Sequence, residues 1–137
     1  MQRTLYRHGL YALMIALFIS LCGLANAADA LPKSGPLLPE KAKALITSQG
    51  RRLTIVDVRT KQEYDAGHIK GAKLIPVEVI EHNLDKLPDG PVLIVCRTGR
   101  RAGIAYDIIM KAQPQRQNLW YLQGTPVYHP DGTYEFL

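Results

Sequence analysis

Short apolar runs that alternate with helical patterns restrict the fold of this chain more than any other feature. Three of these runs, LTIVDV at 53–58, PVLIVC at 91–96 and NLWYLQ at 118–123, have the length and composition of strands. AKLIPV, at 72–77, is predicted as a further short strand. PVLIVC is apolar throughout, which is typical of a strand buried on both faces of a parallel sheet.

Helical segments separate these runs. They are predicted from Pro39 to a stop at Gly50, over 60–67, over 77–87 and from Arg101 onward. In the second segment Thr60 is a candidate cap, with Glu63 three residues later. Strands that alternate with helices predict an α/β fold. We expect a three-layer sandwich with a central parallel sheet of about five strands flanked by helices.

The first 27 residues have the three parts of a secretory signal peptide. A basic start with Arg3 and Arg7 precedes an uncharged apolar run at 10–24, and Ala25-Asn26-Ala27 follows. Cleavage is expected after Ala27, which predicts a periplasmic or secreted protein with no membrane attachment. The alternative is an uncleaved membrane anchor, although the apolar run is shorter than the roughly 20 residues that span a bilayer.

The charge and the cysteine content of the chain limit the classes of function that it can have. Cleavage would remove Arg3 and Arg7 and no acidic residue, lowering the net charge from +5 to +3. Nucleic-acid binding usually needs a basic stripe or face, so we expect no nucleic-acid partner. Cleavage would also remove Cys22 and leave Cys96 alone. An unpaired cysteine in an exported protein indicates intermolecular pairing, a reactive thiol, or a buried small apolar residue.

The loop CRTGRR, at 96–101, gathers positive charge around Cys96. It follows a predicted central strand and leads into a helix, the position where open α/β sheets bind ligands. The N–H groups of the loop and of the first helical turn favour a thiolate over a thiol, and so do the arginines. Cys96 is therefore the candidate nucleophile, although the arginines, Arg100 above all, could simply be solvated. The candidate substrate-binding residues are Arg97, Thr98, Gly99, Arg100 and Arg101.

Two separated motifs resemble the single-domain rhodaneses, or thiosulfate sulfurtransferases. VDVRTKQEYDAGHIKGA, at 56–72, is similar to the amino-terminal signature of that family, and VCRTGRRA, at 95–102, is similar to its active-site loop. The resemblance covers 36–124, which we take as the domain. Residues 28–35 are predicted to be a linker, and 125–137 an irregular tail with a Pro-Asp-Gly turn.

The resemblance implies sulfur transfer through a cysteine persulfide. The Cys96 thiolate would attack the outer sulfur of thiosulfate or a similar small anionic donor, and cyanide or a thiol would then accept that sulfur. It implies neither a metal nor an organic cofactor. Among the arginines, Arg97 and Arg101 match the expected substrate anchors. The sequence does not indicate an oligomeric state.

The first motif is interpreted as structural support. Asp57, at a strand end, can accept loop N–H bonds or pair with Arg59, and Glu63 is near enough in sequence to join that pair. His68 is expected to be structural, because an ionised thiol needs no general base. After Gly124 the chain lacks the second glycine, tryptophan and closing helix common in the family. We therefore expect the wall beside the loop to differ, with more effect on acceptor choice than on the first half-reaction.

Two alternative functions remain open. A persulfide carrier or sensor would hold sulfur on Cys96 without turnover. A cysteine-based phosphatase or arsenate reductase would use a similar loop, but such loops place an arginine where this chain has Ala102. A thiol–disulfide oxidoreductase is disfavoured, because no second cysteine remains to resolve a mixed disulfide.

Overall fold

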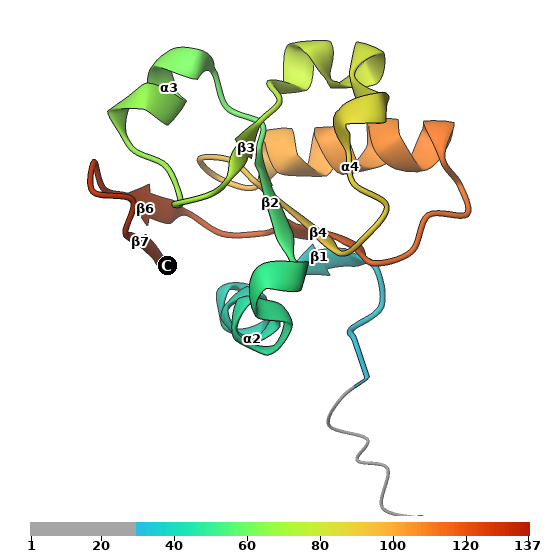
Figure 1. Cartoon of the computed structure of the whole chain (residues 1–137), viewed down its shortest axis with the longest axis horizontal. Coiled ribbons are helices and arrows are strands. Elements are labelled where there is room, and N and C mark those ends of the chain that lie inside the picture. The colour runs from blue at the N-terminus through green and yellow to red at the C-terminus, as the bar shows by residue number, and fades with distance from the viewer. Residues whose placement is uncertain (1–29) are drawn as a thin grey trace, which may run out of the picture. The chain divides into compact units, whose positions relative to one another are not determined.

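A computed structural model describes residues 30–137, and at its centre is a five-stranded, wholly parallel sheet (Figure 1). The strand order is β1-β5-β4-β2-β3. The strands are β1 Gly35–Leu37, β2 Thr54–Asp57, β3 Lys73–Leu74, β4 Val92–Val95 and β5 Leu119–Leu122. The predicted α/β class with a central parallel sheet is confirmed. The predicted signal peptide at 1–27 lies outside the described residues.

Strand β4 forms the middle of the core. Its side chains alternate between two apolar clusters: Val92 and Ile94 contact one, and Leu93 and Val95 contact the other. All four side chains are fully buried. Burial on both faces explains why this strand is an unbroken apolar run in the sequence.

Helices cover the two faces of the sheet. Helix α4, Arg100–Ala112, packs on one face together with the 3₁₀ helices η3, Val77–His82, and η4, Leu84–Lys86. Helix α2, Pro39–Gln49, packs on the other face through Ala42 and Leu45 (Figure 1). The short elements η2, Gly50–Arg52, and α3, Lys61–Ala66, complete the helical part. Within 30–137, no helix is long and apolar enough to cross a membrane.

The segment 77–87, predicted as one helix, forms the two 3₁₀ helices η3 and η4, with Asn83 between them. The apolar spacing is compatible with this arrangement as well as with one helix. Val77 and Ile80 are three residues apart, and so are Leu84 and Leu87, which fits the three-residue turn of a 3₁₀ helix. The four-residue step between these pairs spans Asn83, whose backbone leaves the helical region.

The carboxyl-terminal segment forms an antiparallel hairpin of β6, Pro126–Tyr128, and β7, Tyr134–Phe136. The Pro-Asp-Gly turn predicted from the sequence joins the two strands, and Thr133 donates two hydrogen bonds to the Asp131 carboxylate there. Phe136 is buried in the same apolar cluster as Ala42 and Leu45 of α2. The hairpin is therefore packed onto the sheet domain.

Candidate functional site

The two sequence motifs meet at the carboxyl edge of the sheet. Strands β2 and β4 are parallel neighbours, with Asp57 in register with Val95. The residues that follow these strands, Arg59 in one and Cys96 in the other, therefore leave the sheet at the same edge. Ligands of open α/β sheets bind at this edge.

The sulfur of Cys96 accepts two backbone hydrogen bonds. The N–H of Gly99 lies 3.1 Å from Sγ and the N–H of Ala102 lies 3.4 Å from it. One donor comes from the loop and the other from the first turn of α4, the two sources that the sequence predicts. Their dipoles favour negative charge on the sulfur.

Cys96 is also buried, with 1% of its surface exposed, and it contacts the apolar cluster beneath α4. Two interpretations of Cys96 from the sequence, a reactive thiol and a buried small apolar residue, therefore each describe part of its environment.

Gly99 gives the loop its tight curl. Its φ of +87° lies in the left-handed region, and a Cβ added there would lie 3.0 Å from the carbonyl oxygen of Leu122. A side chain at this position would both strain the backbone and collide with β5. The glycine is therefore required for the loop to bring its own N–H to the sulfur.

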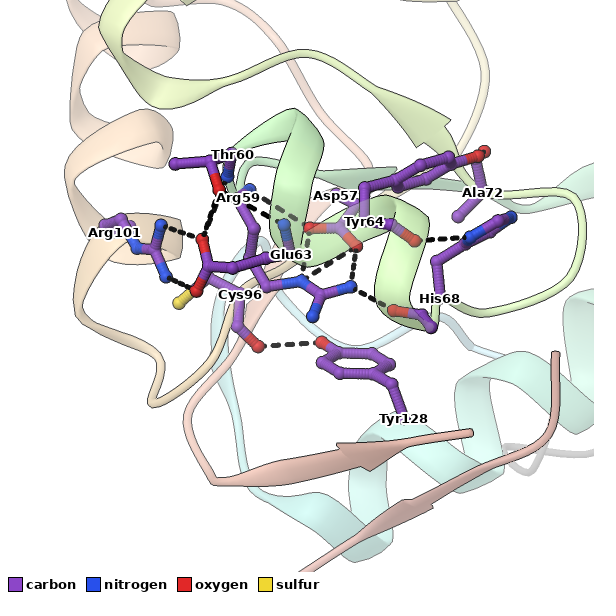
Figure 2. A network of polar contacts seen from close by, with 11 residues as sticks. Asp57, Arg59, Thr60, Glu63, Tyr64, His68, Ala72, Cys96, Arg101 and Tyr128 are labelled. Atoms are coloured by element: carbon purple, nitrogen blue, oxygen red, sulfur yellow. Dashed lines mark hydrogen bonds and ion pairs between the residues drawn. The ribbon is translucent and has the colours of Figure 1, made fainter. Parts of the chain in front are cut away.

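Among the loop arginines, Arg101 differs from the other two. It makes a bidentate ion pair with Glu63, with N–O distances of 2.7 and 2.8 Å (Figure 2). This bond raises the pKa of Arg101 and lowers the pKa of Glu63 to about 2. Arg97 and Arg100 are exposed and make no side-chain hydrogen bond or ion pair within residues 30–137. Their positive charges are thus not paired with a carboxylate among the described residues.

Glu63 is held in place by the cap of α3. Thr60 Oγ1 accepts the N–H of Glu63 at 3.2 Å, and the Glu63 carboxylate accepts the N–H of Thr60 at 3.0 Å. The predicted cap is present as a full capping box. Glu63 was expected to join Asp57 and Arg59, but its ion pair is with Arg101 instead. It links the first motif directly to the loop.

Asp57 and Arg59 form a buried pair behind the loop. The Asp57 side chain is fully buried, that of Arg59 is 6% exposed, and their closest N–O distance is 2.7 Å. Asp57 also accepts the backbone N–H of Arg59, and Arg59 donates to the carbonyl of Gly67 at 2.7 Å. Burial, the largest single effect, would lower the pKa of Arg59, but the hydrogen bond to Asp57 and the charge of Asp57, with smaller effects from Tyr128 and Glu63, together raise that pKa. The pair fixes the turn after β2.

His68 lies at the end of this network farther from Cys96 (Figure 2). Its ring stacks on Tyr64, with centroids 3.7 Å apart, and its Nδ1 lies 2.8 Å from the Tyr64 carbonyl oxygen. Tyr64 in turn donates to the carbonyl of Ala72 at 2.6 Å. These contacts fit a structural role for the histidine.

Tyr128 is the site residue that the sequence analysis missed. Its hydroxyl donates to the carbonyl oxygen of Cys96 at 2.7 Å, and its ring lies 3.8 Å from the guanidinium carbon of Arg59. It belongs to β6, in the segment expected to be an irregular tail. The only signal was that the chain departs from the expected pattern after Gly124.

Other features of the described residues do not add to this site. Within 30–137, no group of three or more His, Cys, Asp or Glu side chains is placed to hold a metal ion. A hollow of about 560 Å³ is lined by Asp89 and residues 113–118. Those residues precede β5, so the hollow lies at the amino edge of the sheet, opposite Cys96.

The family model for the rhodanese-like domain matches residues 38–135. The chain belongs to this family. The match takes in strands β2 to β5 of the sheet, both motifs and nearly all of the carboxyl-terminal hairpin.

Relatives in sequence and in structure agree with this membership. The probable adenylyltransferase/sulfurtransferase MoeZ of Mycobacterium tuberculosis is 37% identical over 95 residues, which cover 66% of this chain and 24% of MoeZ. The chain therefore spans about a quarter of the length of that relative. Among solved structures, SSP1007 of Staphylococcus saprophyticus is 28% identical with a TM-score of 0.53, covering 66% of this chain and 88% of that one. A rhodanese-like domain protein of Staphylococcus aureus is 26% identical with a TM-score of 0.53, covering 66% and 86%.

Proposed function

We propose that this protein is a sulfurtransferase that carries a sulfane sulfur on Cys96. In the first step the Cys96 thiolate attacks the outer sulfur of thiosulfate or a similar donor. The bond from the outer sulfur to the sulfonate sulfur breaks, and sulfite leaves with the electron pair. In the second step cyanide or a thiolate attacks the outer sulfur of the persulfide, and the Cys96 thiolate is released.

The observation that carries the proposal is the pair of N–H groups directed at Sγ. One belongs to the loop at the carboxyl end of a central strand and the other to the first turn of α4, and both supply positive dipoles where the thiolate must exist as attacking and leaving group. The family supports sulfur-transfer chemistry in general, and the relative MoeZ carries sulfurtransferase in its name.

The remaining loop groups suit an anionic donor. Arg97 and Arg100 are exposed beside Cys96 and are the uncompensated charges of the loop. We assign to them the attraction of thiosulfate and the stabilisation of the negative charge that develops on the departing sulfite. Arg101, paired with Glu63, joins the start of α4 to the start of α3 and adds a positive charge to the loop that carries Cys96.

Transfer of sulfur from thiosulfate to cyanide tests the proposal, with Cys96→Ala and Cys96→Ser as variants. The wild type should turn over, and mass spectrometry should show one added sulfur after thiosulfate and its loss after cyanide. Neither variant should do either. Equal rates for wild type and Cys96→Ala would refute the proposal.

The same measurements separate the alternatives. A carrier or sensor would gain one sulfur on Cys96 without steady-state transfer. A phosphatase would hydrolyse an aryl phosphate and lose that activity in Cys96→Ser. We favour sulfur transfer over phosphate chemistry because the ring that closes at Arg101 is one residue shorter than a phosphatase loop.

A further inference from the structure

The carboxyl-terminal hairpin reaches the reactive loop through one side chain, Tyr128. The tyrosine hydroxyl donates to the carbonyl oxygen of Cys96, the residue that bears the sulfur, at 2.7 Å (Figure 2). Its ring rests on Arg59, whose guanidinium is fixed by Asp57 and the carbonyl of Gly67. The phenol is therefore anchored on a buried ion pair and directed at the backbone of the candidate nucleophile.

This hydrogen bond fixes more than one atom. The peptide between Cys96 and Arg97 is planar and trans, as are all peptides of residues 30–137. When Tyr128 holds the carbonyl on one side, the N–H of Arg97 must point to the other side. If this plane turned, the backbone that leads from Cys96 to Gly99 would turn with it, and the Gly99 N–H that reaches Sγ would shift.

Tyr128 can donate this bond at every pH where the protein works. Burial, followed by the charge of Asp57, raises the pKa of the phenol far above its usual range. Replacing tyrosine with phenylalanine therefore removes a hydrogen bond without removing a charge. The ring that packs on Arg59 is kept.

We propose that Tyr128 is a positioning residue for Cys96, acting through the Cys96 carbonyl to hold the loop in the form that stabilises sulfur anions. Its effect on turnover rests on the proposed sulfurtransferase function. Its effect on the reactivity of the thiol does not.

Tyr134→Phe is the matched control for Tyr128→Phe. Tyr134 lies on the other strand of the same hairpin and is also partly buried, and its ring packs on Phe136 with centroids 4.9 Å apart. Its hydroxyl makes no hydrogen bond within residues 30–137. The charged groups closest to the loop, Arg101 with Glu63 and Arg59 with Asp57, are the same in both variants.

The test is the rate at which iodoacetamide alkylates Cys96 across a range of pH, measured under conditions where circular dichroism shows every variant folded. In Tyr128→Phe we expect the pH of half-maximal alkylation to rise. The alkylation rate near neutral pH should fall by about fivefold, which corresponds to the loss of one neutral hydrogen bond. Tyr134→Phe should follow the wild type. In the sulfur-transfer assay, Tyr128→Phe should lower kcat by about fivefold, with the KM for thiosulfate within twofold of wild type.

Each outcome decides the proposal. A Tyr128→Phe profile that coincides with the wild type overturns it, and so does an equal change in Tyr134→Phe. A purely structural hydroxyl would lower the unfolding temperature and leave alkylation and kcat unchanged, which also overturns it. If the wild type transfers no sulfur, the proposed function fails, and the alkylation profiles still decide the role of Tyr128.

Discussion

Glu63 and Arg101, 38 residues apart in the sequence, face each other in a bidentate ion pair beside the candidate nucleophile. The pair joins the capped start of α3 to the first turn of α4. The role of Arg101 as a substrate anchor stays a prediction. Because two carboxylate oxygens of Glu63 accept from its guanidinium, we expect Arg101 to act mainly by balancing the charge of Glu63 and by shaping the loop.

Removing Arg101 should impair binding of an anionic donor through Glu63. In Arg101→Ala the Glu63 carboxylate stays negative near the sulfur and repels thiosulfate, so we expect a KM several times higher. The free energy of unfolding should fall by about 1 kcal/mol, as for a partly exposed ion pair of good geometry. Arg100→Ala, which removes an exposed arginine from the same turn, should change stability by less than about 0.5 kcal/mol.

The double variant Glu63→Gln/Arg101→Ala separates charge balance from direct binding. If Arg101 acts by neutralising Glu63, the thiosulfate KM of the double variant should return most of the way to the wild-type value. A KM equal to that of Arg101→Ala would show that the guanidinium itself binds the donor.

The same ion pair predicts how stability depends on pH. The bond to Arg101 lowers the pKa of Glu63 from 4.5 to about 2 in the folded protein. A carboxyl group with a depressed folded pKa stabilises the protein above its unfolded pKa and loses that contribution as pH falls through the folded value. The contribution of Glu63 should thus be complete above about pH 4.5 and vanish toward pH 2.

Urea unfolding of wild type and Glu63→Gln at a series of pH values measures this contribution. Glutamine is compatible with a capping box, so the α3 cap should survive the change. The difference in unfolding free energy between the two proteins should shrink as pH falls from about 4.5 toward 2. A difference that stays constant over this interval would show that the ion pair does not form in solution.

Much of this arrangement could be predicted from the sequence, because each strand carries its own local signal. PVLIVC is apolar since both faces of β4 are buried, and the carboxyl edge of a parallel sheet brings the segments after β2 and β4 together. The cap formed by Thr60 and Glu63 is a local pattern of the same kind. These features need only residues that are close in sequence, or a rule of sheet topology.

The features that could not be predicted depend on contacts between distant side chains. No periodicity indicates that Glu63 pairs with Arg101 rather than with Arg59, because Arg101 is 38 residues away in the sequence. The contact of Tyr128 with Cys96 also joins distant residues, 32 positions apart. In addition, a hairpin with three-residue strands carries only a weak sequence pattern. The segment 77–87 shows a subtler limit: an apolar face at mixed spacings of three and four fits an α-helix and two 3₁₀ turns equally well.

The buried pair behind the loop should be far more sensitive to mutation than an exposed pair. Asp57→Asn leaves the Arg59 guanidinium buried without its counter-charge, which should cost about 3–5 kcal/mol of stability. Asp65→Asn breaks the ion pair with Lys61, whose side chain is 74% exposed, and should cost about 0.3–0.5 kcal/mol. Urea unfolding of both variants gives the comparison. Similar losses in the two would mean that water reaches the Asp57 carboxylate.

Gly99 and Gly103 give the sharpest test of the loop geometry, since both would gain one methyl group. In Gly99→Ala the alanine must adopt a left-handed backbone conformation, and its Cβ would lie 3.0 Å from the Leu122 carbonyl oxygen. Left-handed backbone alone costs about 1–2 kcal/mol, and the collision adds to it. In Gly103→Ala the Cβ lies within α4, 3.4 Å from the Tyr121 ring, and helix propensity should offset that contact or give up to about 1 kcal/mol of stability.

The two variants should differ more in chemistry than in stability. The N–H of Gly99 is one of the two that reach Sγ, so relief of the collision in Gly99→Ala must move that donor away from the sulfur. We expect slower alkylation of Cys96 by iodoacetamide near neutral pH, and loss of sulfur transfer even at temperatures where the variant is folded. Gly103→Ala should keep both rates. If Gly99→Ala folds and alkylates at the wild-type rate, then the amide of Gly99 does not stabilise the thiolate, and the anion must depend on the N–H of Ala102 and the loop arginines.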